Sequence, residues 1–157
     1  ADGRREDKYY LGFNWAAYSC DIKRLGGFDP RFGPGAPTGA TGQETDMQER
    51  MRTAEIAAVD VPDAAVTHYV PKERCRARWA LWRRFRAGIS GYHKTGGGME
   101  KIRKALNTAW EGGLLVGKSM LVGRPASILF GVARIWAAAG SLYAYWQDRT
   151  PPNSETE

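Results

Sequence analysis

The feature that most constrains the fold is a segment rich in glycine and proline, residues 33–42, which runs directly into a helix-forming segment, Gln43–Ala54. Glycine and proline at this density exclude a regular helix or strand, so residues 33–42 must form a loop. Long loops inside compact domains are usually functional or disordered. Glu44 and Asp46 lie in the first turn of the predicted helix, where unpaired backbone N–H groups favour negative charge. These acids are therefore either helix-capping residues or reactive carboxylates.

Positive charge is concentrated in the middle of the chain. The 157 residues carry a net charge of +6. Residues 72–104 hold 11 Lys/Arg against 2 Asp/Glu, a balance of +9, whereas residues 1–71 hold 8 against 11, a balance of −3. A basic block of this kind suits anionic lipid, a phosphate-bearing ligand or nucleic acid as a partner.

The cysteines and the start of the chain indicate a reduced compartment. Cys20 and Cys75 form neither a disulfide framework nor a Cys-x-x-Cys metal pair, which predicts a cytoplasmic setting. The chain begins at Ala1 without a basic and then apolar leader, so we expect no secretory signal and allow for a piece of a longer protein.

Short apolar runs predict strands before and after the glycine-rich loop. Tyr9–Tyr18 is aromatic-rich, and Gly12 and Asn14 inside it predict a strand followed by a turn. Ile56–Val61 and Ala64–Val70 predict two further strands separated by a proline turn.

Helical patterns account for most of the remaining sequence. Gly96–Gly98 separates two of these helices as a flexible break, and Gly112-Gly113 is expected to end the second, before an apolar run at Leu114–Val122. The predicted helices are Ser19–Leu25, Lys72 to about Tyr92, Met99–Trp110 and Ala126–Trp146.

Several short motifs occur in an order and spacing that resemble the second half of a family 2 glycosyltransferase of GT-A fold. No single motif is specific, but together they cover roughly residues 9–92. The motifs are Gly12-Phe13-Asn14-Trp15-Ala16-Ala17, Leu25-Gly26-Gly27-Phe28-Asp29, Gly42-Gln43-Glu44-Thr45-Asp46-Met47, Arg50-Met51 and Pro62-Asp63-Ala64-Ala65-Val66-Thr67-His68.

The resemblance implies a fold and a set of functional residues. The fold would be α/β, the acceptor side of a Rossmann-like sheet. Glu44 matches the acid that serves as general base in that family, with Asp46 as its neighbour. Gln43 stands where the family usually has a further acid. His68 matches a histidine that joins a divalent metal, Mg or Mn, beside the nucleotide diphosphate.

Further positions are expected to bind substrate on the same resemblance. Residues 75–79, Cys-Arg-Ala-Arg-Trp, partly resemble the Gln-x-x-Arg-Trp signature of processive members, with cysteine in place of glutamine. The alternative is a basic amphipathic helix that lies on anionic lipid. The expected substrate-binding residues are Asn14, Trp15, Gln43, Arg74, Arg78 and Trp79.

The activity implied is an inverting sugar transfer from a nucleotide sugar to a polysaccharide or lipid-linked acceptor. A carboxylate takes the proton of the attacking hydroxyl, which contributes roughly 10²–10⁴-fold to the rate. The family's acidic Asp-x-Asp motif is absent from the chain. We therefore expect a nucleotide-binding half to precede Ala1, and we expect the isolated chain to be inactive.

The predicted organisation has four parts. A flexible N-terminus, residues 1–8, precedes the acceptor-side part of the catalytic domain, residues 9–95. A helical extension that associates with membrane, residues 96–147, leads to a disordered tail, residues 148–157.

The last apolar segment, Ala126–Trp146, has 21 residues, roughly 31 Å as a helix and barely enough to span a bilayer. Arg134 near its middle would cost about 2.5–3.5 kcal/mol on insertion. Spanning the membrane, lying on its surface and packing on the globular domain all stay open. With a lipid-linked acceptor, the chain is expected at the cytoplasmic face of the cell membrane.

A function of another class is also open, a non-enzymatic basic module that binds anionic lipid or nucleic acid. The aromatic residues interleaved with the basic block give it support. Trp79, Trp82 and Phe85 fall mostly on the apolar face of the predicted helix, however. That placement suits a core better than base stacking, so nucleic acid is the weaker alternative.

Overall fold

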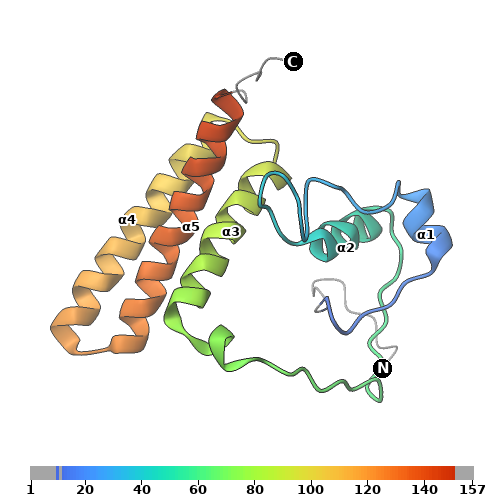
Figure 1. The fold of residues 1–157 in the computed structure, drawn as a ribbon, viewed down its shortest axis with the longest axis horizontal. Coiled ribbons are helices and arrows are strands. Elements are labelled where there is room, and N and C mark those ends of the chain that lie inside the picture. The colour runs from blue at the N-terminus through green and yellow to red at the C-terminus, as the bar shows by residue number, and fades with distance from the viewer. Residues whose placement is uncertain (1–9, 11, 151–157) are drawn as a thin grey trace.

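The computed structural model describes residue 10 and residues 12–150, which form helices joined by loops and extended connections (Figure 1). Three long helices lie together, and two short helices with long connections lie beside them (Figure 1). The elements in chain order are α1 (Ser19–Arg24), α2 (Gln43–Thr53), the 3-10 helix η1 (Lys72–Cys75), α3 (Ala77–Lys94), α4 (Met99–Val122) and α5 (Pro125–Arg149).

The predicted α/β fold is wrong. The described residues contain no β-strand, and the nearest approach to one is a single bridge residue, Val59. Ile56–Val61 and Ala64–Val70, expected as strands, are irregular or extended backbone and largely exposed. An extended segment without a neighbouring strand leaves its N–H and C=O groups to water. Within the described chain these segments find no partner strand, so their apolar runs produce no sheet.

The strand predicted over Tyr9–Tyr18 is missing as well. Tyr10 and residues 12–18 form a turn, a bend and irregular backbone that leads into α1. The predictions for residues 1–8 and 151–157 lie outside the described residues, whereas Asp148 and Arg149 belong to α5.

α5 lies between α3 and α4 and packs against both (Figure 1). Two glycines allow α3 and α5 to approach closely. A Cβ atom at Gly88 would lie 1.9 Å from the Ala137 carbonyl oxygen, and one at Gly140 would lie 1.9 Å from the Phe85 carbonyl oxygen. Ser141 Oγ also donates a hydrogen bond of 3.1 Å to the Gly88 carbonyl. Glycine is thus required here by helix packing.

Glycines also allow α4 and α5 to approach closely. The prediction that Gly112-Gly113 ends a helix is wrong. Gly112-Gly113 does not end the helix, because α4 continues through both residues to Val122. A Cβ atom at Gly112 would lie 2.7 Å from the Gly131 carbonyl oxygen, and the reverse distance is also 2.7 Å. The glycine that predicts a break therefore serves as a contact between helices. The helices predicted around α1 and α2 are confirmed to within one residue at their C-termini.

The glycine-rich loop contributes to the hydrophobic core. Phe32 and Ala40, at its two ends, are buried between the long helices. Tyr92 is 4% exposed, and its burial raises the pKa of its phenol. The buried cluster consists of Phe32, Ala40, Ile89, Tyr92, Ile102 and Ala144.

Only one helix of the described chain, α5, is long and apolar enough to cross a membrane. Its most apolar window has a mean hydropathy of 1.3, and 17% of that window is buried. Such a helix, alone, is weak evidence for a membrane span. Its contacts with α3 and α4 show that α5 packs on the protein, while its outer face stays open to solvent.

The close approach of α3 and α5 predicts opposite effects for two glycines of α3. Gly88→Ala adds a methyl group where the carbonyl of Ala137 lies, so it should lower the free energy of unfolding by about 1–3 kcal/mol. Gly91→Ala is the matched control, because nothing lies within 4 Å of its Cβ position. It should raise the free energy of unfolding by about 0.5–1 kcal/mol. Urea unfolding measures both values, and equal stabilisation by the two changes would contradict the packing.

Candidate functional site

The glycine-rich loop is held to α3 by hydrogen bonds with two α3 side chains, and the hydroxyls of Thr41 and Ser90 are also 3.3 Å apart. Arg86 Nε donates to the Gly39 carbonyl at 2.7 Å, and Ser90 Oγ accepts from the Thr41 backbone N–H at 2.7 Å. The two α3 residues are four positions apart and so lie on one face of the helix. Because the loop leads directly into α2, these bonds fix the start of α2 relative to the long helices.

Residues near the start of the described chain fold back onto α2. Gln48 makes two hydrogen bonds with the backbone of Tyr10, 2.7 Å as acceptor and 2.9 Å as donor. Gly12 lies against the Glu44 side chain, because a Cβ atom at Gly12 would be 3.0 Å from the Glu44 carboxyl carbon and from Oε1. A larger residue at this position would displace the carboxylate.

The same segment also contacts the extended connection that follows α2. Phe13 stacks on His68, with ring centroids 4.1 Å apart and an angle of 5° between the rings. Asn14 Nδ2 donates to the Ala64 carbonyl at 3.2 Å. Three motif segments that are distant in sequence, Tyr10 with residues 12–15, residues 43–48 and residues 64–68, therefore meet in space. We refer to this set as the motif cluster.

The two acids of the first turn of α2 have different surroundings. Asp46 accepts a hydrogen bond of 2.9 Å from Arg50 Nε, and its side chain is only 16% exposed. Arg50 also donates to the carbonyls of Leu25 and Gly27, at 2.7 and 2.8 Å. Asp46 thus fixes the side chain of Arg50, and Arg50 in turn binds backbone carbonyls just after α1 ends. Glu44 is half-buried and makes no ion pair or hydrogen bond within the described residues.

Gln43 and Trp15 serve packing in this structure. The Gln43 amide lies over Gly33, where a Cβ atom would approach its Oε1 to 2.2 Å. Trp15 packs edge-on against Phe28, at 6.4 Å between ring centroids. These contacts join the motif cluster to the segment before α2, and the prediction that both residues bind substrate stays a prediction.

Arg74, Arg78 and Trp79 lie apart from the acids of α2. The guanidinium carbons of Arg74 and Arg83 lie 6.0 and 5.2 Å from the centroid of the Trp79 ring. The loop contacts α3 at residues 86–90, about 10–16 Å further along the helix than Trp79. The structure brings these three residues together with one another but not with Glu44.

The described residues do not form a metal site by themselves. Nowhere in residues 12–150 do three His, Cys, Asp or Glu side chains lie close enough to hold an ion together. His68 is exposed, and its ring face is covered by Phe13. His68 could supply one ligand at most, and the others would have to come from another part of the protein.

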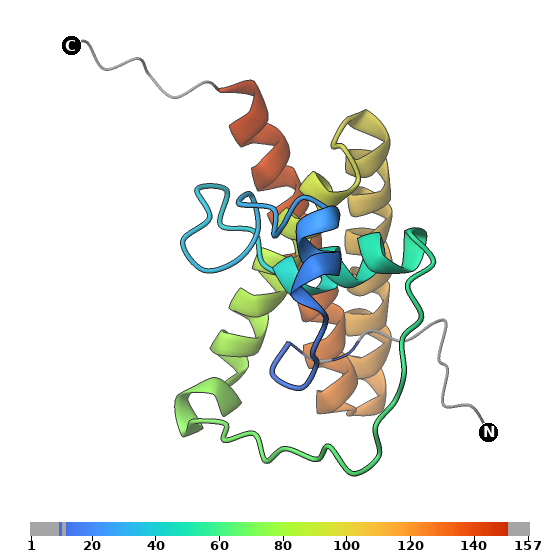
Figure 2. The same ribbon diagram turned by 90° about the vertical axis from the view of Figure 1, so that its right-hand side faces the viewer.

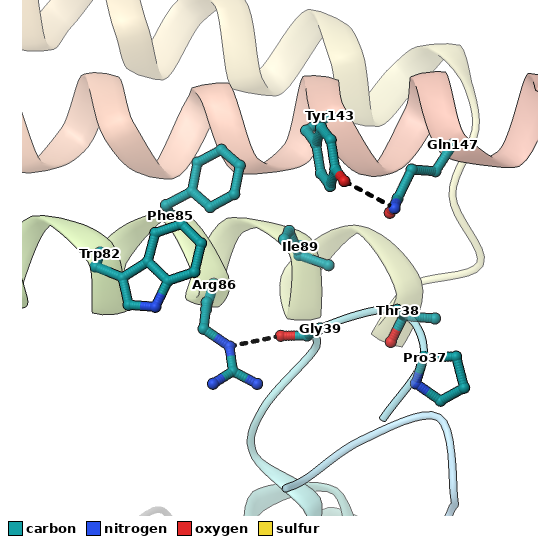
Figure 3. A pocket seen from close by; sticks show the side chains of 9 residues that line it. All are labelled: Pro37, Thr38, Gly39, Trp82, Phe85, Arg86, Ile89, Tyr143 and Gln147. Carbon is teal, nitrogen blue, oxygen red and sulfur yellow. Dashed lines mark hydrogen bonds between the residues drawn. The ribbon is translucent and has the colours of Figure 1, made fainter. Parts of the chain in front are cut away.

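A separate pocket of about 390 Å³ is lined by the glycine-rich loop, α3 and α5 (Figure 3). Trp82 and Phe85 are stacked at 5.3 Å and form one wall with Tyr143 of α5. Neither Glu44 nor His68 lines it. The lining residues are Pro37, Thr38, Gly39, Trp82, Phe85, Arg86, Ile89, Tyr143 and Gln147.

Comparison with known proteins yields no match to a protein-family model, to a curated protein or to a solved structure. The resemblance to family 2 glycosyltransferases consequently rests on the short motifs alone.

Residues that the sequence analysis missed hold the site in place. Arg50 was noted only as part of a motif, and Gln48 received no role. Arg86 and Ser90 lie among the basic residues of α3, where nothing distinguishes them. Asp46 and Arg50 have the i, i+4 spacing of a helical ion pair, which is the one signal available in advance. Their further partners are 23 to 49 residues away in sequence and cannot be read from local patterns.

The contacts of Arg50 predict a large loss of stability on its removal. Arg50→Met loses three hydrogen bonds and leaves Asp46 unpaired, so the free energy of unfolding should fall by about 2–3 kcal/mol. Arg24→Met is the matched control, because its ion pair with Asp21 is exposed and such pairs contribute about 0–1 kcal/mol. Equal losses for the two variants in urea unfolding would show that Arg50 does not connect α1 to α2.

Proposed function

We propose that this chain is the acceptor-side part of an inverting glycosyltransferase and that Glu44 is its general base. The observation that carries the proposal is that one segment, residues 12–14, contacts both the unpaired carboxylate of Glu44 and the segment that contains His68. Gly12 touches Glu44, and the next residue, Phe13, touches His68. The residues that match the family pattern are thus neighbours in space, although the surrounding secondary structure is not a sheet.

The choice of Glu44 over Asp46 follows from their partners. A general base needs a carboxylate that is able to accept a proton from substrate. Asp46 already accepts a hydrogen bond from Arg50 and its side chain is only 16% exposed, so its carboxylate is less accessible to a substrate hydroxyl. Glu44 has no such partner within residues 12–150 and lies in the first turn of α2, directly after the glycine-rich loop. Asp46 is therefore assigned a positioning role.

The proposed reaction is a single displacement. The acceptor hydroxyl oxygen forms a bond to the anomeric carbon of the donor sugar, and its proton passes to the Glu44 carboxylate. The bond from that carbon to the diphosphate oxygen breaks, and the nucleoside diphosphate leaves with the electron pair. Inversion at the anomeric carbon follows from attack on the side opposite the leaving group.

The proposal requires a nucleotide-binding part in addition to the residues described here. No three potential metal ligands converge in the described part of the chain, so no step is assigned to a metal. His68, beside Phe13, would face the diphosphate if the donor binds as the family resemblance implies. Asn14 donates a hydrogen bond to the Ala64 carbonyl, and it would line the groove that binds the sugar or the acceptor.

The proposed base predicts a large loss of transfer in Glu44→Gln, made in the full-length protein that contains both parts. The amide cannot take the hydroxyl proton, so release of nucleoside diphosphate should fall roughly 10²–10⁴-fold. The assay uses UDP-glucose, UDP-N-acetylglucosamine, GDP-mannose and dTDP-rhamnose with a membrane fraction as acceptor. Glu55→Gln is the matched control, because Glu55 is exposed just beyond α2, and it should keep wild-type rates.

Two results would count against the proposal. Near-normal release by Glu44→Gln would remove the base from this position. Absence of release by the wild-type protein with every donor would remove the transferase function itself. Circular dichroism of Glu44→Gln should match the wild-type protein, because the described structure gives Glu44 no bond to lose.

A further inference from the structure

The turn between α4 and α5 exposes several large apolar side chains. Met120, Leu121 and Val122 are 67%, 89% and 66% exposed. On the α5 side of the turn, Leu129 and Phe130 are 41% and 51% exposed. These side chains project from the end of a helical hairpin and contribute little to the core. An apolar patch of several neighbouring residues marks a surface that another phase or molecule covers.

The same end of the hairpin is basic. Residues 112–133, which include the turn, contain Lys118 and Arg124 and no Asp or Glu. Both cations are exposed, and neither makes an ion pair with any described residue. The first acidic residue back from the turn along α4 is Glu111, which pairs with Arg134 about 16 Å from the turn. Apolar and cationic side chains are therefore mixed at the turn without compensating negative charge.

η1 adds further positive charge at this end of the molecule. The turn and η1 both lie at the lower end of the three long helices in two perpendicular views (Figures 1 and 2). Residues 72–78 carry four exposed cations and one acid, Glu73. The cations are Lys72, Arg74, Arg76 and Arg78.

We propose that this end of the molecule, the α4–α5 turn together with η1, docks on the surface of a bilayer that contains anionic lipid. Met120, Leu121 and Val122 enter the interfacial region, and the cations of the turn and of η1 contact the headgroups. Anionic bilayers attract such clusters, and amphipathic apolar residues strengthen the attachment. The inference goes beyond the proposed transfer and does not depend on it.

A lipid surface fits these residues better than a nucleic acid does. Nucleic acid would neutralise the cations but would leave the apolar turn in water. Lys118 and Arg124 also limit the depth of insertion, because a charge at the bilayer centre is costly. The attachment is therefore shallow, and α5 does not need to cross the membrane.

Flotation with lipid vesicles tests the proposal. The full chain should bind vesicles of phosphatidylcholine mixed with phosphatidylglycerol, and binding to phosphatidylcholine alone should be weaker. Leu121→Asp should weaken binding roughly tenfold or more, since it removes the most exposed apolar residue of the turn. Leu106→Asp makes the same change at a 53% exposed site nearer the start of α4 and should have little effect.

The cations are tested in the same way. Arg124→Gln should weaken binding roughly fivefold, and Arg103→Gln, an exposed cation nearer the start of α4, should not. Added salt should weaken binding of the wild-type protein. A bimane fluorophore at Leu121→Cys should shift to the blue on vesicles, whereas one at Leu106→Cys should not. The labelled proteins carry Cys20→Ser and Cys75→Ser, because both cysteines are exposed.

The proposal is overturned if Leu121→Asp binds vesicles as well as Leu106→Asp does and the fluorophore at position 121 does not shift. Tight binding to duplex DNA that is insensitive to Leu121→Asp, without vesicle binding, would assign the basic residues to nucleic acid instead. Vesicle binding needs neither donor nor acceptor. Its failure is thus separable from failure of the proposed transfer.

Discussion

The attachment of the glycine-rich loop to α3 is the interaction on which the rest of the structure depends. Arg86 and Ser90 bind the loop through its backbone, and Phe32 and Ala40 bury its two ends among the long helices. A loop of small residues can lie this close to a helix because few side chains intervene. The α2 side, including Glu44, is placed relative to the long helices by this contact together with the ion pair of Glu49 and Lys94.

The helices were predictable because their signals are local. The boundaries of these helices depend on backbone conformation alone. They are marked by glycines after α1 and before α2 and by the proline at the start of α5. The strands were not predictable as such, because an apolar run becomes a strand only where a partner supplies hydrogen bonds. Gly112 shows the same limit in a helix. The sequence alone does not distinguish a glycine that packs against Gly131 from a glycine that ends a helix.

The candidate site was partly predictable for a related reason. The positions of Glu44 and Asp46 in the first turn follow from the boundary of α2, and the structure agrees. Their different partners do not follow from it, because Arg50 reaches the carbonyls of Gly27 and Leu25, just after α1, which are 23 and 25 residues away. Gln43 also lies over Gly33, a contact that depends on the path of the loop and has no signal in the sequence. Local chemistry identified the acids, and only tertiary contacts separated their roles.

The part of the molecule that carries α2 is joined to the long helices by noncovalent contacts and by one covalent connection. The contacts include the bound glycine-rich loop and the ion pair of Glu49 with Lys94 at 3.9 Å, and the covalent connection is the extended, largely exposed segment of residues 55–71. Because the covalent connection is long and exposed, the position of Glu44 relative to the long helices is set by the noncovalent contacts and not by the chain that joins the two parts.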